Sequence, residues 1–537
     1  MLKNQCFYVG MLVCLLTACG GGGGGSSDSN SLTNVTQIAS SSISFSSSSA
    51  ESSLNASSSI ANSSISSSIQ SSVSRSSRSL PNIAKVFQVG SSTLVEPVIQ
   101  ITPAPERVQT GEVFTLQTVA FSEEGEIKNI NWTQVSGPTV SSAESANQLK
   151  VSAGDPGDVV LEGKVTDNKG KSVSKQVAFT VAQPFSSKAK LLQGNSNGRG
   201  VDLVIVGDAF LAEDQAKLEE AARDLLGYIF DYDDYALMHY QSLINVWLVE
   251  SISSSRDVPQ SNSGGNTLLG AYFGCAGIAR LLCVNDQKVI DHIAQHVPQY
   301  DQILVLVNSG IYGGAGGHVA TASLNSEVKN VVLHELGHSL VLLADEYVDS
   351  NVGIYFNEEP FAANITINPA VLDVKWNYWF EDKNSIAGYN KSNYSDSEVG
   401  YFLGGGYRAT GIWRATNDSI MRSLNAPYGS VNREAWALTI WNYYSATDKF
   451  LPSGATVSRS SNSQVFSVPL IIDPAYMRVN WWVNDVKVEA ANSAPFLILT
   501  AVDETIRSVK VTVEDDTQFI RRDLKGVSKF QHSWSIQ

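Results

Sequence analysis

Two histidines and a glutamate lie close together near the middle of the chain, at a spacing that suits a metal centre. His334 and His338 are four residues apart, and Glu335 lies between them in an apolar, helix-compatible run over residues 331–340. On a helix, residues four apart share one face at about 6 Å, so both imidazoles can bind one zinc ion. Glu335 projects at an angle from which it can act as general base toward a water molecule at the metal. The pattern predicts a hydrolytic zinc site.

The third zinc ligand does not follow from spacing alone. Metzincin peptidases have Gly seven and His or Asp ten residues after the first His, whereas this chain has Val341 and Ala344 there. Around a helix axis, Asp345 returns to within about 20° of His334, but along an unbroken helix it lies about 10 Å beyond His338. Asp345 can therefore bind zinc only if the chain bends back soon after the second histidine. Other carboxylates that stay open are Glu346, Glu358 and Glu359.

The segments before the motif predict an α/β domain over residues 190–450. An apolar run at 201–206 is typical of a strand buried on both faces, and residues 212–230 have the apolar spacing of an amphipathic helix. The remaining predicted elements are strands at 244–249 and 303–307 and a helix at 289–296. In zincins an edge strand near the cleft pairs with an extended substrate, and the glycine-rich residues 313–323 are where such a strand is expected.

Two small all-β sandwich domains are expected to flank this α/β domain. Residues 85–183 contain short alternating strands separated by Gly, Asp and Asn turns, and residues 451–537 show similar strand signals. The stretch 132–138 and the later stretch 165–170 resemble polycystic-kidney-type immunoglobulin-like domains of extracellular enzymes. Such modules are mostly spacers, so we expect no catalytic role for them.

The N-terminus is typical of an exported, lipid-anchored protein. The apolar run at 7–18 has the length of a signal-peptide core, so residues 1–18 are predicted to be a signal peptide. It ends in a sequence that resembles the lipobox of bacterial lipoproteins, which implies lipidation of Cys19 and, with Gly20 following, sorting to the outer membrane. Residues 19–84 are rich in Gly and Ser and are predicted to be a flexible linker. In an oxidising compartment, Cys275 and Cys283 are expected to form a disulfide.

A family resemblance becomes specific once the motif is extended. The run from His334 to Ser339, continued by residues 343–347, resembles the signature of the metallo-type IgA-peptidase family. Residues 201–208, 312–317 and 431–436 are similar to that family as well, so the resemblance covers about residues 200–444. It implies a metzincin-like endopeptidase with two histidines and an acidic third ligand, carried here onto Asp345. It further implies a Met-turn at Met421, with Arg422, Tyr347 and Tyr428 as candidates for stabilising the oxyanion.

Composition narrows the function classes. The 537 residues carry a net charge of -15 and no basic stripe, which disfavours nucleic-acid binding. Together with the histidine motif, the N-terminal pattern and the family resemblance, this leads us to expect a secreted, lipid-anchored, zinc-dependent endopeptidase. Its expected substrates are extracellular proteins, including immunoglobulin- or glycoprotein-like ones. The alternative is a cell-surface adhesin or glycan-binding protein built on a peptidase-like scaffold, although such a scaffold is expected to have lost Glu335 or a histidine.

Overall fold

The computed structural model describes most of the chain from residue 84 onward. The described residues are 84–87, 96–101, 104–105, 107–122, 124–145, 148–182, 186–194, 200–231, 236–260, 264–349, 354, 358–370, 373–380, 399–444, 450–461, 463–468, 472, 476–491 and 494–537. The predicted signal peptide at 1–18, the lipidation site Cys19 and the linker up to residue 83 lie outside them.

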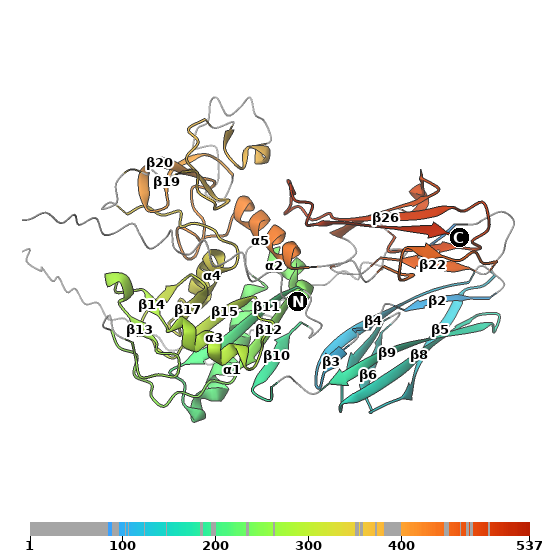
Figure 1. The fold of residues 1–537 in the computed structure, drawn as a ribbon, viewed down its shortest axis with the longest axis horizontal. Coiled ribbons are helices and arrows are strands. Elements are labelled where there is room, and N and C mark those ends of the chain that lie inside the picture. The colour runs from blue at the N-terminus through green and yellow to red at the C-terminus, as the bar shows by residue number, and fades with distance from the viewer. Residues whose placement is uncertain are drawn as a thin grey trace, which may run out of the picture. The chain divides into compact units, whose positions relative to one another are not determined.

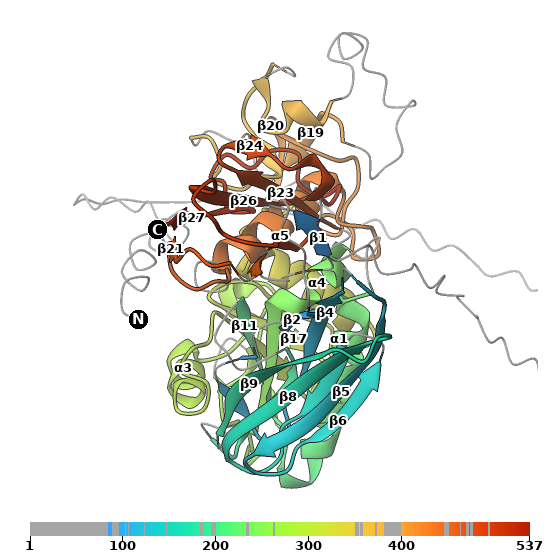
Figure 2. The ribbon, with the colours of Figure 1, turned by 90° about the vertical axis from the view of Figure 1, so that its right-hand side faces the viewer.

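Two sheets, whose strands are mostly antiparallel, form the first β domain. One has the strand order β2-β4-β7-β6 and the other β3-β9-β8-β5; β9, β8 and β5 run side by side in Figure 2. Inward residues of both sheets share one core, in which the rings of Phe114 and Phe179 meet edge to face at 5.0 Å. The strands are β2 (Val98–Ile101), β3 (Arg107–Gln109), β4 (Val113–Phe121), β5 (Ile127–Ser136), β6 (Ser141–Ser145), β7 (Gln148–Ser152), β8 (Gly157–Asp167) and β9 (Ser172–Ala182).

A six-stranded mixed sheet forms the centre of the next domain, with the strand order β10-β12-β11-β15-β17-β16 (Figure 1). Strands β12, β11, β15 and β17 run parallel, while β10 and β16 are antiparallel edges. The bounds are β10 (Ala189–Gln193), β11 (Val201–Asp208), β12 (Ile244–Val249), β15 (Gln302–Val307), β16 (Gly314–Ala315) and β17 (Val319–Ser323). The strands predicted at 201–206, 244–249 and 303–307 are thus confirmed.

Helices cover both faces of this sheet because the apolar residues of β11 alternate between two cores. Leu203 and Ile205 pack into the cluster that contains α1 (Gln215–Ile229) and α4 (Val328–Ser339). Val204 and Val206 pack into the opposite cluster, with α3 (Asp286–Ala294). Every residue of β11 is buried, as expected for a central parallel strand. The predicted helices at 212–230 and 289–296 correspond to α1, after a short 3₁₀ turn at Ala212–Asp214, and to α3.

A long excursion follows α4 before the last helix of the domain. It contains a three-stranded sheet with the order β18-β20-β19, made of β18 (Ile365–Thr366), β19 (Phe402–Gly405) and β20 (Arg408–Arg414). The chain then enters α5 (Ser430–Tyr443), whose buried residues include Asn432 and Glu434. Smaller elements of the domain are α2 (Ala236–His239), β13 (Tyr272–Phe273) and β14 (Leu282–Cys283).

The C-terminal segment is also built from strands. Its larger sheet has the order β21-β27-β26-β23-β24, and β22 and β25 belong to a three-stranded sheet with β1 (Ala84–Phe87). The bounds are β21 (Thr456–Val457), β22 (Gln464–Ser467), β23 (Met477–Val483), β24 (Val486–Lys487), β25 (Phe496–Leu499), β26 (Ser508–Asp515) and β27 (Lys529–Ile536). The predicted boundary at residue 85 therefore falls within β1, which pairs in parallel with β25.

Buried polar contacts join this segment to the α/β domain. Tyr240 and Trp441 both donate to Asp515 Oδ2, at 2.8 and 2.6 Å. Glu434 accepts from the backbone N–H groups of Arg521 and Arg522 at 2.7 and 2.8 Å. Hydrogen bonds with charged acceptors are strong when they are shielded from water, so these contacts fix α5 against the C-terminal segment of the chain.

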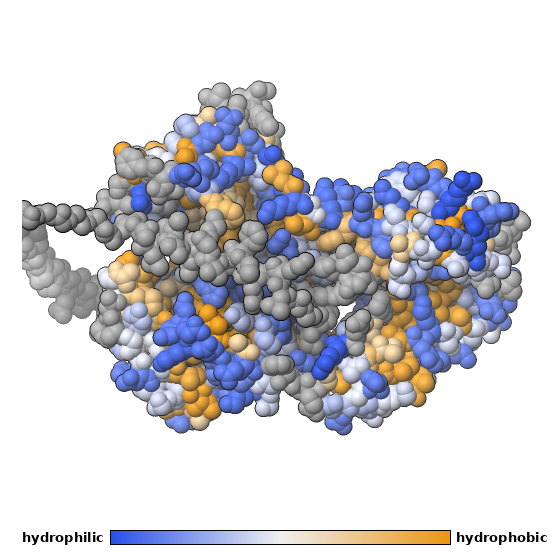
Figure 3. All heavy atoms as spheres, in the orientation of Figure 1, coloured by the Kyte–Doolittle hydropathy of each residue, from blue (hydrophilic) through white to orange (hydrophobic). Residues whose placement is uncertain are grey.

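Hydrophilic and hydrophobic residues alternate over the face of the described residues shown in Figure 3. None of the helices among the described residues is long and apolar enough to cross a membrane.

Asp202 in β11 should make stability depend on pH. Its side chain is 3% exposed and accepts from Trp247 Nε1 at 2.7 Å. Burial raises the pKa of Asp202 to about 6. The folded state then holds this proton to higher pH than the unfolded state, so the free energy of unfolding falls as pH rises from about 4 to about 7. The contribution from this one group is about 3 kcal/mol.

Asp202→Asn should remove that part of the pH dependence. The measurement is thermal unfolding of the metal-free protein at about pH 4.5 and about pH 7.5, with wild type and variant compared at each pH. We expect the variant to gain stability relative to wild type at the higher pH. An equal difference between the two proteins at both pH values would contradict this account.

Candidate metal centre

Helix α4 carries the histidine pair and ends directly after it. Val331, Val332, Leu333 and Leu336 are buried, whereas the His334 and His338 side chains are partly exposed. The two Nε2 atoms lie 3.1 Å apart. This distance is close to the separation of about 3.3 Å between two ligands of a tetrahedral zinc ion. The predicted pairing of the two imidazoles on one helical face is therefore present.

The chain reverses immediately after α4. Leu342 adopts φ 63°, a left-handed conformation that is unfavourable for a branched side chain. The next amide, of Leu343, donates to Gly337 O at 2.9 Å, which folds the chain back along the last turn of the helix. The reversal that Asp345 requires in order to reach the histidines thus takes place at residues 340–343.

Asp345 completes a three-ligand cluster. Its Oδ1 lies 3.2 Å from His334 Nε2 and 3.1 Å from His338 Nε2. Although burial opposes ionisation, imidazole rings that carry a second proton on Nε2 donate to Asp345 in the metal-free protein and hold its pKa far below its ordinary value. Two nitrogens and one carboxylate oxygen at these separations fit a tetrahedral zinc ion with one position left open. Glu335 has a ligand atom within 4.8 Å of the histidines, but Asp345 is nearer and is the better third ligand.

Backbone carbonyls orient both imidazoles. His334 Nδ1 lies 2.8 Å from Ile420 O, and His338 Nδ1 lies 2.7 Å from Leu343 O. A carbonyl can only accept, so each Nδ1 carries the proton in the neutral ring, and each Nε2 is the nitrogen left to bind the metal. Ring orientation and tautomer are therefore set before any metal binds.

Tyr407 orients the carboxylate, although nothing in the sequence predicts this role. Its hydroxyl donates to Asp345 Oδ2, which leaves Oδ1 directed at the histidines. Burial and the negative charge of Asp345 raise the pKa of Tyr407, so the phenol stays protonated and can donate. Tyr407 lies 62 residues after Asp345, and no local motif marks it.

The predicted Met-turn lies beneath the cluster. Met421 is fully buried, and its neighbour Ile420 supplies the carbonyl that orients His334. A Cβ atom added to Gly337 would lie 2.8 Å from Met421 Sδ, closer than side-chain atoms approach one another. The glycine inside the helical motif therefore makes room for the thioether. The backbone N–H of Glu346 donates to Met421 O at 2.8 Å, which joins the turn to the ligand segment.

Glu346, the first alternative ligand, has a different role. Its side chain is fully buried, and each carboxylate oxygen accepts two side-chain hydrogen bonds. The donors, at 2.9–3.1 Å, are Asn364, Asn432, Thr416 and Ser419. Burial raises the pKa of Glu346, while these donors lower it. With all its acceptor positions occupied, Glu346 joins the ligand segment, the Met-turn and α5.

The two downstream alternatives point elsewhere as well. Glu359 accepts from the backbone of Ile367 at 3.0 Å and pairs with Lys375 at 3.0 Å. Glu358 is exposed. Neither contacts the histidine pair within the described residues, so Asp345 is the acidic ligand that the structure brings to the cluster.

Glu335 faces the glycine-rich edge strand. A Cβ atom on Gly314 would lie 3.1 Å from Glu335 Oε1, and one on Gly316 would lie 3.0 Å from Oε2. Side chains at these two positions would therefore crowd the carboxylate. Burial raises the pKa of Glu335. Because β16 is an edge of the sheet, the predicted edge strand near the cleft is present, as a hairpin of β16 and β17.

The three oxyanion candidates differ in their surroundings. Tyr428 is 2% exposed and donates to Leu333 O at 2.6 Å, so its hydroxyl supports the helix. Arg422 donates to Asn417 O at 2.7 Å. Tyr347 follows the ligand Asp345 by two residues, and its ring meets that of Tyr407 at 5.1 Å. Of the three, Tyr347 has the closest connection to the cluster.

The predicted disulfide is present, between Cys275 and Cys283.

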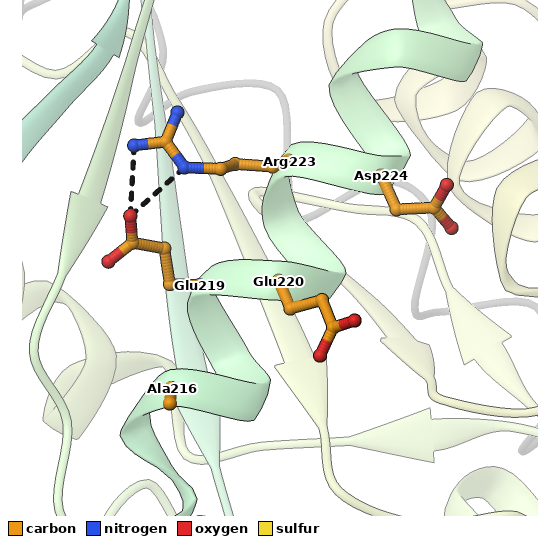
Figure 4. Close-up of a pocket in the computed structure, with 5 residues that line it drawn as sticks. All are labelled: Ala216, Glu219, Glu220, Arg223 and Asp224. Atoms are coloured by element: carbon orange, nitrogen blue, oxygen red, sulfur yellow. Dashed lines mark hydrogen bonds and ion pairs between the residues drawn. The ribbon is translucent and has the colours of Figure 1, made fainter.

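A separate depression of 570 Å³ lies on α1, lined by Ala216, Glu219, Glu220, Arg223 and Asp224 (Figure 4). Glu219 is bound there by Arg223 and Lys190. The depression holds neither a histidine nor a cysteine, so it offers no comparable chemistry.

Comparison with known proteins agrees with these observations. Residues 190–396 match the family model described as IgA Peptidase M64, and residues 106–181 match a family model described as a PKD domain. The resemblance stated from the sequence is confirmed. The peptidase match includes the histidine pair, Glu335 and Asp345, and it ends before Tyr407 and Met421.

Solved structures are similar to parts of the chain only. The PKD domain of the KIAA 1837 protein is 20% identical, covering 18% of this chain and 91% of that chain, with a TM-score of 0.15. The CbhA fibronectin(III)-like modules of Clostridium thermocellum are 16% identical, covering 20% and 56%, with a TM-score of 0.15. Scores this low carry no conclusion about the fold. No curated protein was found to be similar to the chain.

Removing the acidic ligand should abolish tight metal binding. We expect Asp345→Ala to lower zinc affinity by at least about 100-fold, because losing a ligand costs more than losing a group that only orients one. Competition with a chromogenic chelator measures the affinity. Glu358→Ala, a change to an exposed carboxylate, is the control and should bind zinc like wild type. Unchanged zinc affinity in Asp345→Ala would show that another carboxylate is the third ligand.

Tyr407→Phe tests the orienting hydrogen bond. The variant keeps the ring that packs on Tyr347 but loses the hydroxyl that holds Asp345 Oδ2. We expect zinc affinity to fall by about 10- to 100-fold. The matched control is Tyr401→Phe, which removes a hydroxyl bound to Asn368 O. If both variants bind zinc equally well, Tyr407 does not orient the ligand.

Proposed function

We propose that the chain is a zinc-dependent endopeptidase whose α/β domain has the zincin architecture. The peptidase family match over residues 190–396 supports peptide-bond hydrolysis. The observation that carries the proposal is the convergence of His334, His338 and Asp345, at 3.1–3.2 Å, beside Glu335. This donor set leaves an open coordination position, which is the usual difference between a catalytic and a structural zinc site.

Each residue of the cluster has a defined part in the reaction. When bound, the zinc ion supplies a Lewis acid that polarises the scissile carbonyl and makes water more acidic. Glu335 takes a proton from the attacking water and delivers it to the leaving amine. Its raised pKa favours this, because a carboxylate in a poorly solvated position holds the proton more readily during transfer. The histidines and Asp345 remain fixed by Ile420, Leu343 and Tyr407 throughout.

The edge strand is the proposed docking line for substrate. An extended peptide can pair with the backbone of an exposed edge strand, which gives affinity without sequence preference. Gly314 and Gly316 leave the Glu335 carboxylate uncovered on that side. Because the outer side of Gly314 is bridged to Leu281, the free part of this line follows Gly314, and a peptide laid along it would present its backbone carbonyls to the cluster.

The proposed location is the cell envelope, with a lipid anchor at Cys19, on the outer membrane. The N-terminal sequence pattern supports this, and the disulfide fits an oxidising compartment. The proposed substrates are extracellular proteins, with immunoglobulin- or glycoprotein-like chains included.

Glu335→Gln separates catalysis from metal binding. We expect the variant to bind zinc like wild type and to lose hydrolysis of casein by at least about 1,000-fold, since the amide cannot accept the proton. Glu220→Gln, on the surface of α1, is the control and should retain full activity. Near wild-type turnover by Glu335→Gln would overturn the mechanism.

A chelator distinguishes the alternative of an adhesin. We expect hydrolysis by wild type to stop on chelation and to return with zinc. Absence of hydrolysis with and without chelator, together with tight polysaccharide binding, would favour the adhesin instead.

A further inference from the structure

The loop closed by the disulfide lies along the outer side of the edge strand. Cys275 and Cys283 link its two ends, eight residues apart. Leu281 forms a parallel bridge with Gly314 of β16, and the hydroxyl of Thr321 donates to Leu282 O at 2.5 Å. The loop therefore covers the outer side of β16 at Gly314 and borders the residues after Gly314, which we propose as the docking line.

Arg280 in this loop spans the space between the edge strand and the ligand segment. Its carbonyl oxygen lies 2.5 Å from the position of a Cβ atom on Gly313, so its backbone is close to the edge strand. Its guanidinium donates to the hydroxyl of Tyr347 at 3.0 Å, so its side chain reaches the segment that follows Asp345. Arg280 therefore joins the segment just before β16 to the segment that follows Asp345.

Among the described residues, the side chain of Arg280 forms no ion pair. Its partner Tyr347 is a neutral phenol, and no carboxylate in the described part of the chain forms an ion pair with it. Its contact with Tyr347, two residues after Asp345, places the positive charge beside the ligand segment. Arg280 is exposed, and the one hydrogen bond of its guanidinium described above, to Tyr347, uses only part of its N–H donors. A guanidinium of this kind can bind a planar carboxylate through two parallel hydrogen bonds.

We propose that Arg280 binds a carboxylate of the peptide substrate close to the scissile bond. The inference rests on the proposed peptidase function and adds substrate selectivity to it. The carboxylate belongs either to an Asp or Glu side chain or to a free C-terminus, since both present the same group. Two exposed apolar side chains lie near Arg280 in the sequence or at the start of the edge segment, Ile278 (44% exposed) and Tyr312 (45% exposed). We therefore expect the substrate to have apolar residues next to the carboxylate.

The test uses a set of matched peptides. One series carries Glu, Gln or Lys at each position around a fixed cleavage site, and a second series ends in a free acid or an amide. For wild type, we expect kcat/KM to be about 10- to 100-fold higher for the carboxylate peptide at one position than for its neutral match. A preference for Glu over Gln identifies a side-chain carboxylate, and a preference for acid over amide identifies the C-terminus.

Variants of Arg280 assign the preference to this residue. Arg280→Gln should reduce the preference to about one, and Arg280→Glu should favour the Lys peptide, with zinc content and melting temperature unchanged. Arg223→Gln, on α1, is the control and should keep the wild-type preference. Equal preference in wild type and Arg280→Gln would overturn the proposal.

The disulfide supplies a second variant. Replacing Cys275 and Cys283 by Ser should release the loop, lowering the carboxylate preference while zinc binding by α4 is retained. A double variant that keeps the full preference would show that the disulfide does not position Arg280, and would contradict the geometry on which the proposal depends.

Binding without cleavage separates this inference from the proposed function. Zinc-loaded Glu335→Gln should bind the carboxylate peptides more tightly than their neutral matches, and the further change Arg280→Gln should remove the difference. Carboxylate-dependent binding without any cleavage by wild type would leave the inference standing and overturn the peptidase function. Cleavage by wild type without any carboxylate preference would support the peptidase function and overturn the inference about Arg280.

Discussion

The candidate site depends on one contact, that of Asp345 Oδ1 with the Nε2 atoms of His334 and His338, at 3.2 and 3.1 Å. A helix alone can supply the two imidazoles, but it cannot supply a third ligand seven residues further on, because its axis carries that residue away. The left-handed backbone of Leu342 costs about 1–2 kcal/mol and reverses the chain. This local conformation is what returns a carboxylate to the helix that precedes it, and the three-ligand site exists only because of that return.

Two adjacent carboxylates in this segment have opposite functions because their surroundings differ. Asp345 faces the imidazoles and is held ionised by them, whereas the Glu346 side chain points inward, where burying a charge costs several kcal/mol unless donors surround it. Four side-chain donors from three different segments offset that cost. Since these donors come from Asn364, the Met-turn region and α5, Glu346 holds together the parts of the chain that orient the ligands.

The sequence predicted what is local and missed what is brought together by the fold. The histidine pair, Glu335 and the strands of the parallel sheet follow from periodicity, because each depends on neighbours within one element. Asp345 came from a family resemblance, since its place depends on where α4 ends, and angular and axial arguments disagreed. Tyr407 and Arg280 had no signal: one acts across 62 residues, and the other reaches Tyr347 across 67. The pairing of β1 with β25 is likewise a long-range contact that composition cannot indicate.

The segments that carry the chemistry are fixed by polar contacts more than by apolar packing. The disulfide loop is held by Thr321, the imidazoles by backbone carbonyls, and the ligand segment by Glu346 and Tyr407. Apolar contacts are not directional and allow small sliding movements, whereas hydrogen bonds fix both distance and angle. A metal cluster needs its donor atoms placed to within about 0.5 Å, so the directional contacts are required where the ligands stand. The apolar core of the parallel sheet then has a simpler task, which is to keep α4 and the edge strand at a constant separation.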